Sequence, residues 1–189
     1  MNIRTYCAAE TMRDGTPVTI RALRPDDAEG LLRAVARMSR DSIVLRFFSM
    51  RRDFSESEVA YYVDIDFVGH VALVATLELD DGPCIVAGAR YIVTEPGVAE
   101  VAFAVDDAHQ GRGLGRLLMQ HLVLLARAAG LVELRAEVLP ENQPMLHVFR
   151  GSGLDLAARR QDGVVQVRMP LLPETVPAGA KAASLREST

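Results

Sequence analysis

The sequence has no tryptophan and only two cysteines, Cys7 and Cys84, among its 189 residues. Two thiols in a chain of this length do not make the disulfide framework on which small secreted domains depend. Cys84 lies in the apolar run 84–87, and a free cysteine in such a run is commonly a small buried residue. We therefore expect Cys84 to belong to the core rather than to act as a catalytic thiol.

Long apolar runs are also missing. No stretch reaches the ~18 uninterrupted apolar residues that a membrane-spanning helix needs. The first 13 residues lack the apolar centre of a secretory signal peptide. These absences predict a cytoplasmic protein with no membrane partner.

An excess of basic residues is absent as well. The chain has 25 acidic residues against 21 Lys and Arg, a formal net charge of −4, so no nucleic-acid partner is indicated. No group of His, Cys, Asp and Glu has the spacing of metal ligands, and we expect no metal site. The hydrophobic share of 49% and the charged share of 24% are those of one globular domain with a core.

The hydrophobic pattern predicts one α/β domain with a mixed, mostly antiparallel central sheet flanked by helices. We treat residues 1–16 as an N-terminal segment. Residues 172–189, rich in Pro, Ala, Ser and Thr, are expected to form a disordered tail. The expected strands lie at 18–21, 70–77, 84–93, 100–105, 132–139, 154–160 and 164–169. The expected helices begin near residues 25, 42, 55, 114 and 143.

A glycine-rich loop lies between a buried strand and the strongest helix pattern. In Gln110-Gly111-Arg112-Gly113-Leu114-Gly115-Arg116 three glycines alternate with other residues. Glycines allow close backbone approach, and a helix start offers unpaired N–H groups, so this loop can bind a phosphate or pyrophosphate. It lacks the Gly-Lys-Ser/Thr of a Walker A loop and comes too late for a dinucleotide-binding βαβ unit. A turn that only caps the helix is the plainer interpretation.

The loop resembles the Gln/Arg-x-x-Gly-x-Gly/Ala signature of the GNAT superfamily of N-acyltransferases, and the resemblance covers roughly residues 17–171. More narrowly, residues 39–49, 64–75 and 99–115 are similar to the catalytic domain of bacterial Pat-type protein lysine acetyltransferases. Some of those proteins carry a further large domain. We expect this chain to correspond to the catalytic domain alone.

The resemblance implies acetyl-CoA as co-substrate and assigns the residues that bind it. The loop amides would hold the pyrophosphate, Arg112 and Arg116 would add charge, and the strand backbone would pair with the pantetheine arm. Asn142 matches an Asn that often contacts the arm, although helix capping is an equal alternative. The implied cofactor-binding residues are Phe103, Ala104, Val105, Gln110, Gly111, Arg112, Gly113, Leu114, Gly115, Arg116 and Asn142.

Glu100 is the expected catalytic residue. An amine with a pKa near ~10.4 is almost wholly protonated at neutral pH, so a base must take its proton during direct attack on the thioester. We expect burial between apolar neighbours to raise the pKa of Glu100 into a useful range. The Pat-type proteins carry a functional Glu in the matching strand, and a solvated strand-end acid is the alternative. His70 is a second candidate.

The resemblance fails at one position. Many GNAT enzymes have a Tyr seven residues after the Asn, as general acid for the thiolate, and here that residue is Phe149. The expected function is acetylation of a protein lysine from acetyl-CoA. The alternatives are acetylation of a small amine and a non-catalytic acyl-CoA-binding regulatory module. The sequence does not decide between a monomer and a homodimer. It also does not decide whether the transferred acyl group is acetyl or a longer chain.

Overall fold

The computed structural model describes residues 2–47 and 55–171, so the expected tail at 172–189 lies outside the described residues. The strands within these ranges are β1 (Cys7–Thr11), β2 (Pro17–Ala22), β3 (His70–Leu79), β4 (Gly82–Glu95), β5 (Val98–Val105), β6 (Glu133–Val138), β7 (Ala157–Gln161) and β8 (Val164–Pro170). The α-helices are α1 (Ala28–Arg37), α2 (Arg40–Phe47), α3 (Glu56–Val63), α4 (Leu114–Ala128) and α5 (Gln143–Arg150).

All the described strands form one sheet in the order β1-β2-β3-β4-β5-β6-β8-β7. Neighbouring strands are antiparallel except for β5 and β6, which are parallel. The expected mixed, mostly antiparallel sheet with flanking helices is confirmed. The N-terminal segment also contributes, because β1 pairs with β2 from Cys7↔Arg21 to Thr11↔Pro17. The short, half-polar run of β1 gave no strand pattern to read in the sequence.

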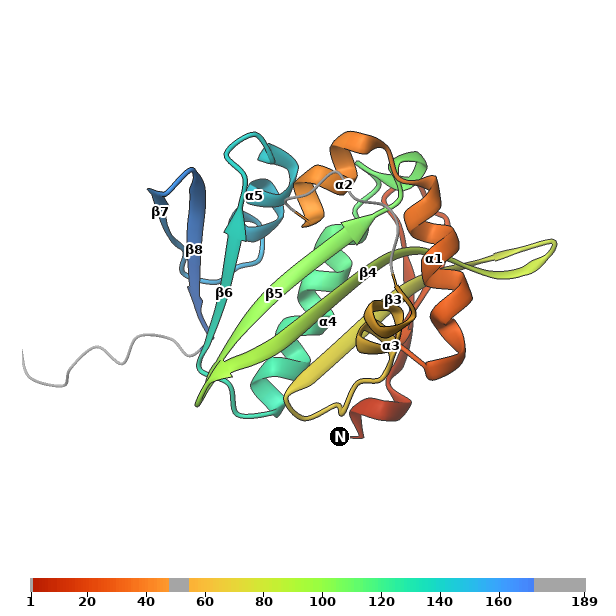
Figure 1. Ribbon diagram of the computed structural model, residues 1–189, viewed down its shortest axis with the longest axis horizontal. Coiled ribbons are helices and arrows are strands. Elements are labelled where there is room, and N and C mark those ends of the chain that lie inside the picture. Colours follow the sequence, from red (N-terminus) through yellow and green to blue (C-terminus); the bar gives the residue numbers. More distant parts are fainter. Residues whose placement is uncertain (1, 48–54, 172–189) are drawn as a thin grey trace, which may run out of the picture.

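The helices cover the two faces of the sheet unequally. Helix α4 lies along one face, while α1 and α3 lie against the other and α2 sits near the end of β5 (Figure 1). The α4 face holds the large core, in which Leu118, Leu122 and Leu125 pack on the sheet and are fully buried. The cluster on the α1 face is much smaller and consists of Leu23, Ile65, Ala72, Val74 and Ile85.

Two helix ends follow from the residues next to them. Ser55 caps α3 in a capping box, with its hydroxyl accepting from the Glu58 amide at 3.3 Å and the Glu58 carboxylate accepting from the Ser55 amide at 2.8 Å. Gly130 follows α4 with φ +78°, the left-handed conformation typical of a helix end. Of the described helices, none is long and apolar enough to cross a membrane.

Candidate active site

The strands β5 and β6 separate along their length. They pair only at Val98↔Glu133, Ala99↔Leu134 and Glu100↔Arg135, so the β6-facing edge of β5 beyond Glu100 has no strand partner among the described residues. Backbone groups left open on such an edge can pair with an extended ligand as an added strand does. Phe103, Ala104 and Val105, the residues that the family resemblance assigns to the pantetheine arm, lie on this open part.

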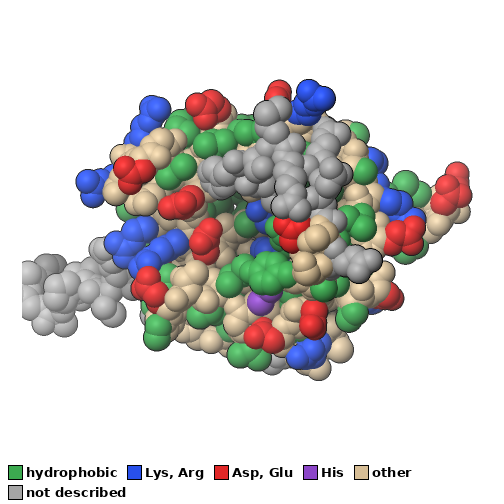
Figure 2. Space-filling view, viewed as in Figure 1, with side chains coloured by type: hydrophobic (Ala, Val, Ile, Leu, Met, Phe, Trp, Pro, Cys, Tyr) green, Lys and Arg blue, Asp and Glu red, His purple; other side chains and the backbone are tan. Residues whose placement is uncertain are grey.

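A cleft of about 440 Å³ occupies the gap. One wall is Glu100–Val105 of β5 and the other is Ala136–Val138 of β6 with α5, and the glycine-rich loop closes one end. Figure 2 shows this face of the molecule hollowed near its centre, with Lys or Arg atoms visible inside the hollow. The cleft thus joins the glycine-rich loop to Glu100 and is lined by both polar and apolar residues.

The glycine-rich loop offers a set of backbone donors to this cleft. Gly111 and Gly113 have φ of +71° and +95°, a region that other residues rarely adopt. Leu117 is the first amide of α4 to bond inside the helix, to Gly113 O at 3.1 Å. Within the described chain, the amides from Gly111 to Arg116 have no recorded acceptor. These free N–H groups at the positive end of a 15-residue helix form an anion site that fits a pyrophosphate.

Gly115 has a different role from the two glycines before it. A Cβ at this position would lie 3.1 Å from Cγ2 of Val148, so the missing side chain lets α4 approach α5 closely. The third glycine of the motif is therefore required by helix packing.

The two loop arginines differ in their surroundings. Arg112 turns toward the β1–β2 turn, where its Nε donates to Asp14 at 2.6 Å and its Nη2 to Thr16 at 3.0 Å. The hydrogen bond from Arg112 lowers the pKa of Asp14 to about 2. Arg116 is exposed and lines the cleft. Of the two, Arg116 is the better placed to meet a ligand phosphate.

Arg13 is a basic residue at the loop that the sequence reasoning missed. Its side chain lies against Gly113, with Cγ 3.2 Å from the position of a Cβ there, and it lines the cleft. The Arg13 amide also donates to Arg112 O at 3.1 Å. The two residues are far apart in the sequence, and only the pairing of β1 with β2 brings Arg13 to the loop.

Gln110 and Asn142 both have structural partners. The Gln110 side-chain amide donates to Val105 O at 3.2 Å and to Ser42 Oγ at 3.0 Å, which ties the loop to β5 and α2. The Asn142 side chain accepts from the Met145 amide at 3.1 Å and caps α5. Asn142 also lines the cleft, so the capping role leaves a contact with the ligand open.

Glu100 lies at the cleft, but its expected burial is wrong. Its side chain is exposed, because the cleft opens at this end of β5, while its neighbours Ala99 and Val101 point into the α4 core. The charge of Glu100 acts on Arg46 of α2. Burial lowers the pKa of Arg46, and the charges of Tyr62 and Glu100 partly offset this. Glu100 therefore faces both solvent and a cation.

Arg90 and His70 form a second polar group on the same face of the sheet. Arg90 Nη1 lies 3.1 Å from His70 Nε2, and its guanidinium lies over the Tyr62 ring at 4.5 Å. Burial and the charge of Arg46 lower the pKa of Arg90 to about 10. Burial and the charge of Arg90 lower the pKa of His70 to about 4. His70 is therefore neutral at pH 7, and its Nε2 lies beside the Arg90 guanidinium.

Phe149 lies where many GNAT enzymes have a tyrosine. Its ring is 1% exposed and packs edge-on against Phe103 at a centroid distance of 5.9 Å. It supplies an apolar wall to the cleft and no proton. The part of the chain that the structure describes contains no group of three or more potential metal ligands.

The remaining histidines lie apart from Glu100. His121 of α4 is buried between Tyr6, whose hydroxyl contacts Nδ1, and Glu10, 3.1 Å from Nε2. His147 is exposed on α5, and His109 lies in the loop, with both of them at the margin of the cleft.

Several known proteins are similar to this chain in sequence. The Acetyltransferase (GNAT) family model matches residues 39–154. Acetyltransferase Pat of Mycolicibacterium smegmatis is 32% identical over 169 residues, which is 88% of this chain and 50% of that protein. Acetyltransferase PA5475 of Pseudomonas aeruginosa is 34% identical over 64% of this chain and 66% of that protein. The chain thus spans between half and two thirds of these curated relatives.

Solved structures of acetyltransferases have the same fold. The GNAT domain of S. lividans PAT superposes with a TM-score of 0.80 at 35% identity, over 87% of this chain and 96% of that domain. The fold alone is shared with yncA from Salmonella typhimurium, determined with acetyl-CoA, at 19% identity and a TM-score of 0.66 over 86% of this chain and 98% of that one. The chain therefore belongs to the acetyltransferase (GNAT) family.

Proposed function

We propose that the chain transfers an acetyl group from acetyl-CoA to a primary amine, and that the amine is a protein lysine. The observation that carries the proposal is the cleft between β5 and β6, which runs from the amide-lined loop at Gly111–Arg116 to the carboxylate of Glu100. Family membership supports the acetyl donor. The relatives named Pat, an acetyltransferase in M. smegmatis and a GNAT domain in S. lividans, support a Pat-like acceptor.

The chain's own residues divide the recognition of acetyl-CoA. The amides of Gly111–Arg116 would hold the pyrophosphate, and Arg13 and Arg116 would add positive charge beside it. The open edge of β5 at Phe103–Val105 would hold the pantetheine arm. When bound, acetyl-CoA supplies an activated acyl carbon, and every other element of the reaction comes from the protein and the acceptor.

Glu100 would act as the general base. The amine nitrogen bonds to the acyl carbon, the carbon–sulfur bond breaks, and the carboxylate accepts the proton that the amine loses. Because the side chain is exposed, the carboxylate can pass this proton to solvent after transfer. The sulfur must also gain a proton, and since Phe149 has none to give, water or the proton released by the amine would supply it.

A small-molecule amine is the second candidate acceptor. Streptothricin acetyltransferase of Streptomyces lavendulae is 41% identical, but only over 49 residues. Arg90 lies on the same sheet face as Glu100, and the charge of Glu100 acts on Arg46, so the two guanidiniums disfavour an acceptor with several positive groups. A single lysine side chain, which brings one charge to one carboxylate, fits this balance better than a polyamine.

The test is a product analysis. The purified chain is incubated with acetyl-CoA and separately with a panel of small amines and a desalted cell lysate, and products are identified by mass spectrometry. Acetyl-lysine on lysate proteins, with slow or no modification of small amines, is the expected outcome. Acetylation confined to the small amines would overturn the lysine assignment. Binding of acetyl-CoA without consumption in either arm would indicate a non-catalytic module.

A further inference from the structure

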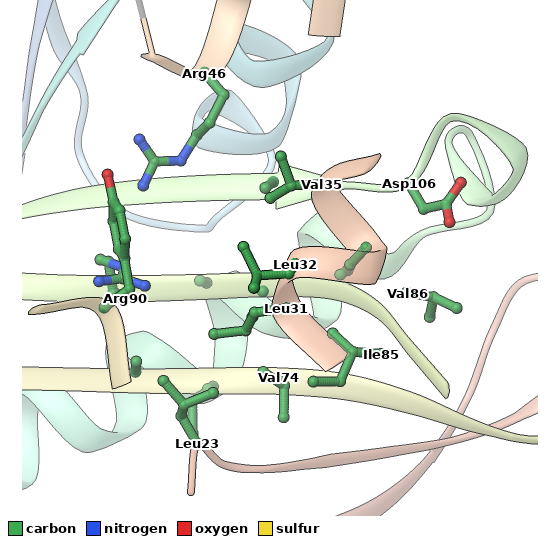
Figure 3. Close-up of a pocket in the computed structure, with 18 of the residues that line it drawn as sticks. Leu23, Leu31, Leu32, Val35, Arg46, Val74, Ile85, Val86, Arg90 and Asp106 are labelled. Carbon is green, nitrogen blue, oxygen red and sulfur yellow. The ribbon is translucent and has the colours of Figure 1, made fainter. Parts of the chain in front are cut away.

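A second cavity, of about 100 Å³, lies between α1 and the sheet. Figure 3 shows Leu31, Leu32 and Val35 of α1 above it, with Val74 and Arg90 on the strands below. The floor is made of small side chains. In the rows of paired residues across β3, β4 and β5, Val74–Gly88–Ala104 and Ala72–Arg90–Ala102, four of the six members are Gly or Ala.

This cavity adjoins the cofactor cleft. Met38, Arg46, Ala102 and Ala104 line both of them, so the two spaces meet at the middle of β5. Ala102 and Ala104 lie on the stretch of β5 beyond Glu100, which has no β6 partner. A group attached at the inner end of the pantetheine slot would therefore lie next to the second cavity.

The lining is apolar apart from its ends. At one end Asp106 is buried and paired with Arg37, whose Nε donates to it at 2.5 Å. At the other end are the guanidiniums of Arg46 and Arg90, with Arg46 pointing down toward Arg90 (Figure 3). The lining residues between the ends are otherwise Ala, Val, Leu, Ile and Gly, with Met38, Tyr62 and Val59 at the margin. Close-packed interiors leave few voids larger than a water molecule, so an apolar space of this size beside a reaction site calls for an occupant.

The charges at the ends decide which occupant fits. An ammonium group would enter beside two guanidiniums, and among the described lining residues the one carboxylate, Asp106, already has a partner in Arg37. A neutral hydrocarbon chain meets no such penalty and gains from burial. An engineered apolar cavity of about 150 Å³ holds benzene, so about 100 Å³ has room for a few carbon atoms.

We propose that this cavity receives the acyl chain of acyl-CoA donors longer than acetyl, up to about four carbons, so that the chain is a short-chain acyltransferase rather than one restricted to acetyl. The inference rests on the proposed function, since it requires the cofactor to lie in the β5–β6 cleft. The reaction balances as for acetyl: the same carbon–sulfur bond breaks, the same carbon–nitrogen bond forms, and only the alkyl group on the acyl carbon differs.

Calorimetric titration of the full chain with CoA, acetyl-CoA, propionyl-CoA, butyryl-CoA and hexanoyl-CoA tests this without an acceptor. Each methylene that enters the cavity should tighten binding about fourfold, from about 0.8 kcal/mol per buried methylene. We expect affinity to rise to butyryl-CoA, which has two more methylenes than acetyl-CoA and should bind about sixteenfold more tightly, and to fall at hexanoyl-CoA. Succinyl-CoA, which is a butyryl-like chain with a terminal carboxylate, is added to the series because Arg90 lies at one end of the cavity.

Gly88 provides the matched variants. A Cβ at Gly88 would meet Leu73 O at 3.4 Å, an ordinary contact, and would project from the cavity floor. Gly88→Ala and Gly88→Val should lower butyryl-CoA affinity stepwise, the second by at least tenfold, and leave acetyl-CoA affinity unchanged. Ala158→Val on exposed β7, outside both cavities, is the control.

Two outcomes would overturn the acyl-chain inference, and a third would overturn the proposed function on which it rests. If Gly88→Val raises the melting temperature and leaves the order of acyl-CoA affinities unchanged, the cavity is only a packing defect. If succinyl-CoA binds more tightly than butyryl-CoA, the site is built for a carboxylate and the apolar assignment is wrong. If no acyl-CoA binds at all, the proposed function itself fails.

Discussion

The carboxylate of Asp107 joins helix α2 to the cofactor loop through Ser39: Oδ2 accepts from the Ser39 amide at 2.8 Å and Oδ1 from its hydroxyl at 2.7 Å. Ser42 Oγ donates to the same carboxylate at 2.8 Å and accepts from Gln110. Burial alone would raise the pKa of Asp107, but these hydrogen bonds outweigh it and lower the pKa. The helix that carries Arg46 is thus fastened to the loop proposed to bind pyrophosphate.

Asp107→Ala should loosen this connection. Hydrogen bonds to a charged acceptor are lost at an exposed site, and we expect the free energy of unfolding to fall by about 1–2 kcal/mol. Urea denaturation measures the change. Asp155→Ala, an exposed aspartate for which the structure records no hydrogen bond, is the control. Equal stability of the two variants would show that the contacts around Asp107 contribute nothing.

Gly113→Asp should prevent cofactor binding. The residue would need the left-handed φ of +95°, its Cβ would press on Arg13, and its charge would repel a phosphate. We expect acetyl-CoA affinity measured by calorimetry to fall at least about 100-fold, which corresponds to about 2.7 kcal/mol. Gly113→Ala separates backbone strain from charge and should lose less. Unchanged affinity in the Asp variant would remove the loop from the cofactor site.

Arg13→Gln should weaken acetyl-CoA binding by about tenfold, because one charge-assisted contact to phosphate is lost. The difference from the unmodified chain should shrink as salt is raised, since exposed charges are screened. Arg159→Gln on exposed β7 removes an equal charge far from the cleft and should have no effect. If the two variants bind equally well, Arg13 packs against Gly113 without contacting the cofactor.

His70 makes stability depend on pH. Its pKa is about 4 in the folded chain against 6.5 for an ordinary histidine, so between these values the unfolded chain binds more protons. Stability contributed by neutral His70 is complete above pH 6.5 and is lost as pH falls toward 4. After allowance for solvent screening of a half-buried group, the loss is about 1 kcal/mol. In His70→Gln the free energy of unfolding should change less over this window, and an identical slope in both proteins would contradict the assignment.

The sequence was sufficient for the features that depend on local pattern. The loop from Gln110 to Arg116 could be placed because glycines, a preceding strand and a following helix are contiguous in the chain. The capping box at Ser55 and the helix end at Gly130 depend on a few adjacent residues. No local pattern indicates the parallel contact of β5 and β6 or the cleft between them.

The features missed depend on contacts between distant segments. Arg13 reaches the loop only because β1 joins the sheet edge, and β1 has too little alternation to be recognised as a strand. Glu100 was expected to be buried because its neighbours are apolar, but those neighbours face α4 while Glu100 faces the open cleft. No sequence pattern indicates that small residues on three strands coincide beneath α1.

Glu100→Gln tests the central claim most directly, with turnover of the lysine acceptor at pH 7 and calorimetric acetyl-CoA affinity measured on the same preparation. Loss of a general base should lower kcat by about 10²–10⁴, and the deficit should shrink as pH rises toward the pKa of the amine. Affinity should hold, because backbone amides provide most of the cofactor contacts, and Glu78→Gln at the exposed end of β3 should behave as the unmodified chain. Near-normal turnover of Glu100→Gln at pH 7 would contradict the account and leave Glu100 a solvated residue at the edge of the cleft.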